Sequence, residues 1–168
     1  MKMKKKRTRR EVGKYSKNKG GGFERKVAKK LREMWPDGEF ERTPKSGGLQ
    51  LKKGWKLGGD IATTSPTFPF CVECKDREGW NFKQFLSPAC QIYKWWDQAV
   101  KDAKTTNKKP MLIFTRNYWP TFVAVRKEDW PFRLITDFIV STPEFVCFEF
   151  SELERLYHRI IHRAVGGD

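Results

Sequence analysis

The chain has 168 residues, enough for one domain with a hydrophobic core, and 38 % of them are apolar. Its 35 Lys and Arg residues outnumber the 20 Asp and Glu residues, which leaves a net charge of +15. This composition excludes a wholly disordered chain, and a positive surplus of this size is typical of proteins that bind polyphosphates such as DNA.

The sequence predicts neither a membrane protein nor a secreted one. No apolar run approaches the roughly 18 residues that a transmembrane helix needs. The lysine-rich N-terminus has no apolar stretch behind it, as a secretory signal would. No helical pattern joins a Lys/Arg face to a wide apolar face, as binding to a membrane surface requires. The four cysteines are therefore expected to be reduced thiols in a cytoplasmic protein that stays with the DNA.

The first 19 residues differ in composition from the rest of the chain. They hold seven Lys, three Arg and one Glu, with few apolar side chains. Such a segment cannot bury enough surface to fold alone, so residues 1–19 are predicted to be a disordered basic arm and residues 20–168 a single domain. The arm residues expected to bind DNA are Lys4, Lys5, Lys6, Arg7, Arg9 and Arg10.

Apolar residues then recur at helical spacing, and they predict a helix from Gly20 to the stop at Pro36-Asp37-Gly38. A short strand is expected near residues 39–43, followed by a loop rich in Gly, Lys and Ser. Residues 57–64 and 68–75 are expected to form a hairpin of two strands around a turn at residues 65–67.

Ser87-Pro88 has the chemistry of a helix start, and it predicts a helix from there to about Lys104. A pair of strands is expected at residues 111–115 and 121–125. A strand at 145–150 and a helix from 151 to about 163 follow. The predicted fold class is therefore α/β, with a mixed central sheet flanked by helices. Its core covers about residues 20–126, and an extension over about 127–168 adds the last strand and helix.

The pattern that carries chemistry is Gly59-Asp60 followed by Glu73-Cys74-Lys75. Alternate residues of a strand share a face, so Glu73 and Lys75 point one way while Cys74 faces the core. Asp60, on the preceding strand, can lie beside Glu73. Two converging carboxylates suit Mg²⁺, and a neighbouring lysine can hold the attacking water or neutralise charge on a phosphate. A solvated Glu–Lys pair on an ordinary strand is the alternative interpretation.

These motifs resemble the PD-(D/E)XK nuclease superfamily and, within it, the archaeal-type Holliday junction resolvases. The resemblance covers about residues 19–125. It includes Lys19-Gly20-Gly21-Gly22-Phe23-Glu24-Arg25, which is similar to the first helix of that family, and Arg42-Thr43-Pro44-Lys45-Ser46-Gly47-Gly48, which is similar to its arginine and serine loop. Gly59 departs from the family pattern, because many members have Pro there.

The resemblance implies an endonuclease that uses Mg²⁺, with Mn²⁺ expected to substitute, and that resolves four-way DNA junctions as a homodimer by symmetric paired nicks. It makes Asp60, Glu73 and the backbone carbonyl of Cys74 the metal ligands, and Lys75 the catalytic lysine. Further catalytic contacts are expected from Glu24 and Ser46. The residues expected to contact DNA in the folded domain are Arg25, Arg42, Lys45, Lys52, Lys53, Trp80 and Gln91.

Several alternatives stay open from the sequence. Glu24 is equally compatible with an exposed residue that stabilises the start of its helix, and Gln91 with a buried amide bonded to the backbone. A nuclease of the same superfamily that cuts flaps, ends or duplex DNA would carry the same motif. A branched-DNA-binding protein without catalysis would keep the same basic surface.

Overall fold

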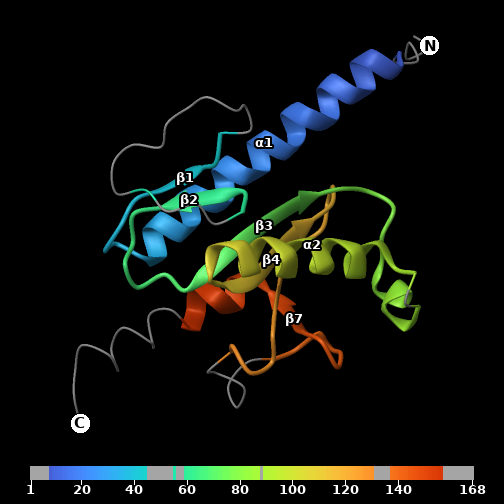
Figure 1. Cartoon of the computed structure of the whole chain (residues 1–168). Coiled ribbons are helices and arrows are strands. Elements are labelled where there is room, and N and C mark those ends of the chain that lie inside the picture. The colour runs from blue at the N-terminus through green and yellow to red at the C-terminus, as the bar shows by residue number, and fades with distance from the viewer. Residues whose placement is uncertain (1–7, 45–54, 56–58, 88, 131–136, 157–168) are drawn as a thin grey trace.

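The structure is a computed structural model of the whole chain, and it describes residues 8–44, 55, 59–87, 89–130 and 137–156 (Figure 1). Its elements are α1 (Arg9–Met34), β1 (Phe40–Arg42), β2 (Ile61–Thr63), β3 (Phe70–Asp76), the 3-10 helix η1 (Phe82–Leu86), α2 (Gln91–Thr106), β4 (Lys109–Thr115), β5 (Phe122–Val125), β6 (Val140–Ser141) and β7 (Val146–Glu149). Residues 150–156 are helical as well. None of the helices in these ranges is long and apolar enough to cross a membrane.

The central sheet has five strands in the order β3-β4-β5-β7-β6. The β3–β4 pair is parallel and the other pairs are antiparallel. The predicted α/β class with a mixed central sheet is therefore confirmed. The C-terminal strand β7 is an internal strand of this sheet, between β5 and β6, instead of an appendage to it.

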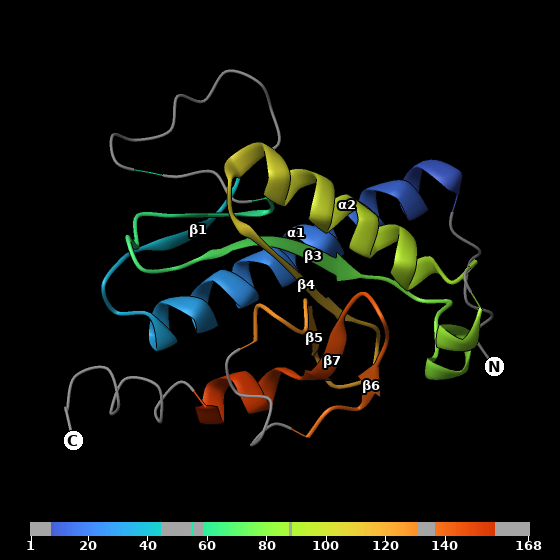
Figure 2. The same ribbon diagram turned by 60° about the horizontal axis from the view of Figure 1, so that its bottom comes forward.

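Alternate residues of the sheet enter two hydrophobic cores, one on each face. On one face, Val72 and Ile113 pack with the apolar side of α1. On the other face, Leu112 and Phe114 pack with α2. Figures 1 and 2 show the sheet between these two helices. Period-two alternation in β4 supplies both cores at once, because successive side chains of a strand point to opposite faces.

The first helix begins earlier than predicted, so the prediction of a disordered arm is wrong for residues 9–19. Composition alone suggested disorder, but contacts distant in sequence favour the helix. The ammonium group of Lys19 pairs with Asp76 at 2.8 Å and with Glu78 at 2.9 Å, which ties this part of α1 to the end of β3. Residues 1–7 of the predicted arm lie outside the described ranges.

The predicted hairpin of residues 57–64 and 68–75 is also wrong as a strand pair. β2 pairs with β1, antiparallel, while β3 pairs along its whole length with β4. A single bridge, between Gly59 and Val72, joins the Asp60 segment to β3. The intervening turn is fixed elsewhere, because the hydroxyl groups of Ser65 and Thr67 both donate to the carboxylate of Asp37 after α1.

The start of the second helix differs from the prediction at Ser87-Pro88. Ser87 ends η1, where its N–H donates to the carbonyl of Gln84 at 2.9 Å. α2 begins at Gln91, and Cys90 is its N-cap, with a sulfur that accepts the N–H of Ile92 at 3.4 Å. The hydroxyl of Ser87 made it the more typical N-cap, but its backbone already closes the preceding 3-10 turn.

Candidate active site

Asp60 reaches β3 because the backbone makes a close approach at Gly59. Gly59 has φ +72°, and a Cβ there would overlap the carbonyl of Val72, so both the conformation and the space require glycine. Proline, with φ fixed near −65°, cannot take this conformation. The N–H of Asp60 donates to the carbonyl of Val72 at 2.7 Å. Its carboxylate, in a side chain that is only 9 % exposed, accepts the N–H of Cys74 at 3.0 Å.

Glu73 and Lys75 share the opposite face of β3 from Val72 and Cys74, as the alternation predicts. Val72 and Cys74 belong to the core under α1. Glu73 is 3 % exposed, and its carboxylate forms an ion pair with the ammonium group of Lys75. The same ammonium group donates to the side-chain oxygen of Gln98, on α2, at 3.0 Å. The interpretation of a solvated Glu–Lys pair is therefore wrong, since the carboxylate is buried.

The charge of Asp60 acts on the carboxylate of Glu73. The pKa of Glu73 is raised from 4.5 to about 7, first by burial and then by the negative charge of Asp60, while Lys75 opposes the rise. Removing water from a carboxylate and placing a second anion near it both disfavour the charged form. A cation between the two acids would reverse this penalty.

The donor set fits a hard divalent cation. Mg²⁺ prefers oxygen ligands, keeps several waters and takes one or two protein carboxylates together with substrate phosphates. Asp60 and Glu73 are the two carboxylates predicted to hold such a cation, and the Cys74 carbonyl remains a predicted third ligand. Within the described ranges, no group of three or more His, Cys, Asp and Glu side chains is placed to hold an ion.

Glu24 and Arg42 form a second buried charge pair next to Asp60. Glu24 is buried on α1, so its interpretation as an exposed helix-start residue is wrong, and its carboxylate is ion-paired with the guanidinium of Arg42. Arg42 lies opposite Ile61 in the β1–β2 register, and the N–H of Thr43 donates to the carbonyl of Asp60 at 2.8 Å. The pair therefore adjoins the backbone that carries Asp60.

Among the residues predicted to bind DNA, Trp80 is a clear error. Its side chain is 0 % exposed and packs edge-on against Phe114 at 4.9 Å and Trp119 at 5.5 Å between ring centroids. It cannot reach DNA from there. Arg25 is exposed on α1. Of Arg9 and Arg10 only the helical backbone is described. The remaining predicted contacts lie outside the described residues; they are Lys4, Lys5, Lys6, Arg7, Lys45, Ser46, Lys52 and Lys53.

Gln98 is the site residue that the sequence did not reveal. Gln91, the predicted amide of this helix, is exposed at its first residue. It stands seven residues before Gln98, about 10 Å along the helix axis. Both residues lie on the same face of α2, so the axial position of the helix along β3 brings Gln98 and not Gln91 to Lys75, and the helical pattern alone does not fix that position. The buried-amide interpretation of Gln91 is wrong.

Comparison with known proteins connects these motifs to a family. The model of the family described as "Phage putative PDDEXK endonuclease" matches residues 15–157, which include Glu24, Asp60, Glu73 and Lys75. Protein D14 of Escherichia phage T5 is 30 % identical to the chain over 119 residues, which cover 68 % of this chain and 72 % of that protein.

Among solved structures, Archaeoglobus fulgidus Hjc, a Holliday junction resolvase from an archaeal hyperthermophile, aligns with the chain. The alignment covers 81 % of this chain and 93 % of Hjc, with 13 % sequence identity and a TM-score of 0.38. At this TM-score the likeness supports no inference about function.

Proposed function

The chain belongs to the family of phage PDDEXK endonucleases, and on this basis we propose that it is a divalent-metal-dependent endonuclease that resolves four-way DNA junctions. The observation that carries the proposal is the meeting of Asp60 and Glu73 beside Lys75. The two acids come from segments with no long strand pairing between them, yet the close approach at Gly59 holds them together.

Each residue of the site has a definite task in phosphodiester hydrolysis. A cation held by Asp60 and Glu73, Mg²⁺ or Mn²⁺, would polarise the phosphate and activate water. One carboxylate oxygen of Asp60 accepts the N–H of Cys74, which fixes the orientation of this carboxylate toward the strand that carries Glu73. The ammonium of Lys75, which is ion-paired with Glu73, would hold the attacking water or neutralise charge on the phosphate oxygens when a cation is bound at the two acids. Gln98 keeps that ammonium in place.

The choice of a junction as substrate is supported by the sequence resemblance at residues 19–25 and 42–48 and by the net charge of +15. Basic residues that contact phosphates bind DNA without reading its sequence, so we expect weak sequence preference. A four-way junction is close to two-fold symmetric. A homodimer with a two-fold axis would present two active sites to symmetric strands, and paired nicks would follow.

The test is cleavage of a synthetic four-way junction, a flap and a linear duplex of matched sequence, each with Mg²⁺, Mn²⁺ or EDTA. Symmetric metal-dependent nicks in the junction alone are expected. Equal cleavage of all three substrates would refute junction selectivity and leave a nuclease of broader action. Tight binding without cleavage in either metal would refute the enzymatic proposal itself. Sedimentation of the protein with junction DNA tests the dimer, which predicts two protomers per junction.

A further inference from the structure

One aromatic side chain stands fully in solvent at the turn between β4 and β5. Tyr118 is 104 % exposed, and its backbone has φ +63°, in the left-handed region. A bulky residue in this conformation is uncommon, because its Cβ crowds the backbone. The fold therefore holds the Tyr118 ring in solvent with a strained backbone, and burial of the ring does not offset the free energy of that strain.

The turn that carries Tyr118 is fixed by contacts on both sides. The N–H of Asn117 donates to the carboxylate of Glu78 at 3.1 Å, and the N–H of Trp119 donates to the carbonyl of Arg116 at 3.2 Å. The guanidinium of Arg116 lies over the ring of Trp119, 3.6 Å from its centroid, and donates to the carbonyl of Trp80. Tyr118 is thus presented by a rigid support, which reduces the entropy that a bound ligand would cost.

The turn lies at the end of the sheet at which β3 carries Lys75, the proposed catalytic lysine. In the parallel register, Lys75 lies opposite Phe114 and Asp76 opposite Thr115. Tyr118 follows Phe114 by four residues, so its Cα lies within about 14 Å of that of Phe114 even in a fully extended chain. A few nucleotides of DNA would span the distance from the active site to this ring.

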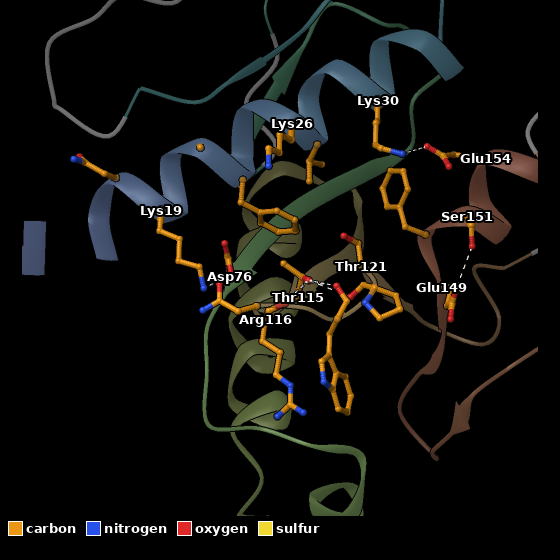
Figure 3. A pocket seen from close by; sticks show the side chains of 18 residues that line it. Lys19, Lys26, Lys30, Asp76, Thr115, Arg116, Thr121, Glu149, Ser151 and Glu154 are labelled. Carbon is orange, nitrogen blue, oxygen red and sulfur yellow. Dashed lines mark hydrogen bonds and ion pairs between the residues drawn. The ribbon is translucent and has the colours of Figure 1, made fainter. Parts of the chain in front are cut away.

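Basic and acidic side chains both line a hollow next to the turn. The hollow, of about 700 Å³, lies between α1 and the ends of β4 and β7, and its wall includes Lys19, Lys26 and Arg116 (Figure 3). Lys19 is neutralised by Asp76 and Glu78. Lys26 is exposed, and Arg116 makes its hydrogen bond to a neutral carbonyl, so both keep charge to offer a phosphate.

We propose that Tyr118 is a stacking site for an unpaired DNA base at the branch point of the substrate, with Arg116 of the same turn available to the DNA backbone. An aromatic ring accepts any base, and stacking of this kind is independent of sequence. A protein partner is disfavoured, because the other exposed large apolar side chains of the described residues, Leu86 and Ile139, belong to other segments of the chain and do not form one apolar run with Tyr118. This inference rests on the proposed function and names the part of the substrate that it recognises.

The test measures binding in EDTA, so that it does not depend on cleavage. Full-length wild type, Tyr118→Asn and Tyr118→Phe are titrated with a four-way junction that carries unpaired bases at its centre, and with a linear duplex. Asn removes the ring but tolerates the left-handed backbone, so the turn is kept. We expect Tyr118→Asn to weaken junction binding about tenfold, the size of one lost base stack, and to leave duplex binding unchanged. Tyr118→Phe should bind as wild type does.

Leu86→Asn is the matched control, since Leu86 is also an exposed apolar side chain, at 92 %. Unchanged junction binding by Tyr118→Asn would overturn the proposal. So would an equal loss on junction and duplex, or an equal loss in Leu86→Asn. A change of sedimentation mass without a change of affinity would identify the ring as a contact between copies of the chain instead. Absence of cleavage by the wild type refutes the proposed function. The binding results in EDTA do not depend on cleavage, so they test the stacking proposal separately.

Discussion

The carboxylate of Asp60 accepts a hydrogen bond from the backbone N–H of Cys74, the residue between Glu73 and Lys75. This contact fixes one acid of the site to the strand that carries the other acid and the lysine. The geometry of the site then depends on backbone positions more than on flexible side chains. Such preorganisation is what a site for metal-assisted hydrolysis needs.

Replacing either acid by its amide is expected to stop cleavage and leave the fold intact. The side-chain oxygen of Asn in Asp60→Asn still accepts the N–H of Cys74, so the local structure survives, but the charge that holds the cation is lost. We expect both Asp60→Asn and Glu73→Gln to lower the single-turnover rate at least about 100-fold, because a metal contributes several kcal/mol to such reactions. Glu41→Gln, an exposed residue of β1, is the control. Full activity in Asp60→Asn would exclude the assigned site.

Gly59 is expected to tolerate no side chain. A Cβ there meets the Val72 carbonyl, and the left-handed conformation adds its own penalty. We expect Gly59→Ala to lower the free energy of unfolding by about 2–5 kcal/mol. Gly79→Ala is the matched control, because Gly79 has φ +85° and open space around its Cα, so only about 1 kcal/mol should be lost. Urea unfolding of both variants measures the difference. Equal losses would contradict the close approach.

Gln98 is expected to position the catalytic lysine. Gln98→Ala removes the acceptor of the Lys75 ammonium, and the loss of one hydrogen bond should lower the cleavage rate at saturating DNA about two- to tenfold. Gln91→Ala, on the same helix, should leave the rate unchanged. A single-turnover assay compares the two variants. A larger effect at Gln91 than at Gln98 would restore the assignment made from the sequence.

Stability without metal is expected to fall as the pH rises. The pKa of Glu73 is raised to about 7 in the folded protein, so the folded state holds this proton more tightly than the unfolded state does. The resulting stabilisation is complete below the ordinary pKa of 4.5 and is lost as the pH rises through about 7. In EDTA, wild type should lose on the order of 2 kcal/mol between pH 5 and pH 8 relative to Glu73→Gln. Parallel urea-unfolding profiles for the two proteins would show that Glu73 does not titrate there.

The five basic residues of segment 1–7 are expected to bind DNA phosphates. Deleting residues 1–7 leaves α1 whole and should reduce the slope of log K against log salt concentration by about 0.9 for each phosphate contact that is lost. Binding to linear duplex over a range of KCl concentrations provides the slope. If the slope is the same with and without the segment, these residues make no phosphate contact.

The sequence predicted those parts of the fold whose signal is local. Alternation placed Glu73 and Lys75 on one face of β3, and the strand pair predicted at residues 111–115 and 121–125 corresponds to β4 and β5. The partner of β2 was not predictable, because a strand of three buried residues carries no mark of its neighbour. The early start of α1 was not predictable from local composition, and its residue Lys19 forms ion pairs with Asp76 at the end of β3 and with Glu78, more than fifty positions away.

Burial of single aromatic residues was equally hidden. Trp80 was a plausible base-stacking residue by type, but contacts with Phe114 and Trp119 place it in the core. The exposed ring on this side of the molecule is Tyr118, three residues beyond the end of β4. The sequence shows both residues only as aromatic. The packing around β4 and β5 decides that Trp80 is buried and Tyr118 is exposed.

The parallel pairing of β3 with β4 also determines when the candidate active site is assembled during synthesis of the chain. β3 is complete at Asp76, but its partner begins only at Lys109, after η1 and α2. Closing such a long crossover is slow compared with local folding. Until β4 and α2 arrive, Glu73 stays hydrated and Lys75 lacks Gln98. A nascent chain therefore carries the acids and the lysine before they are enclosed, and the proposed hydrolysis would begin only after β4 and α2 have joined β3.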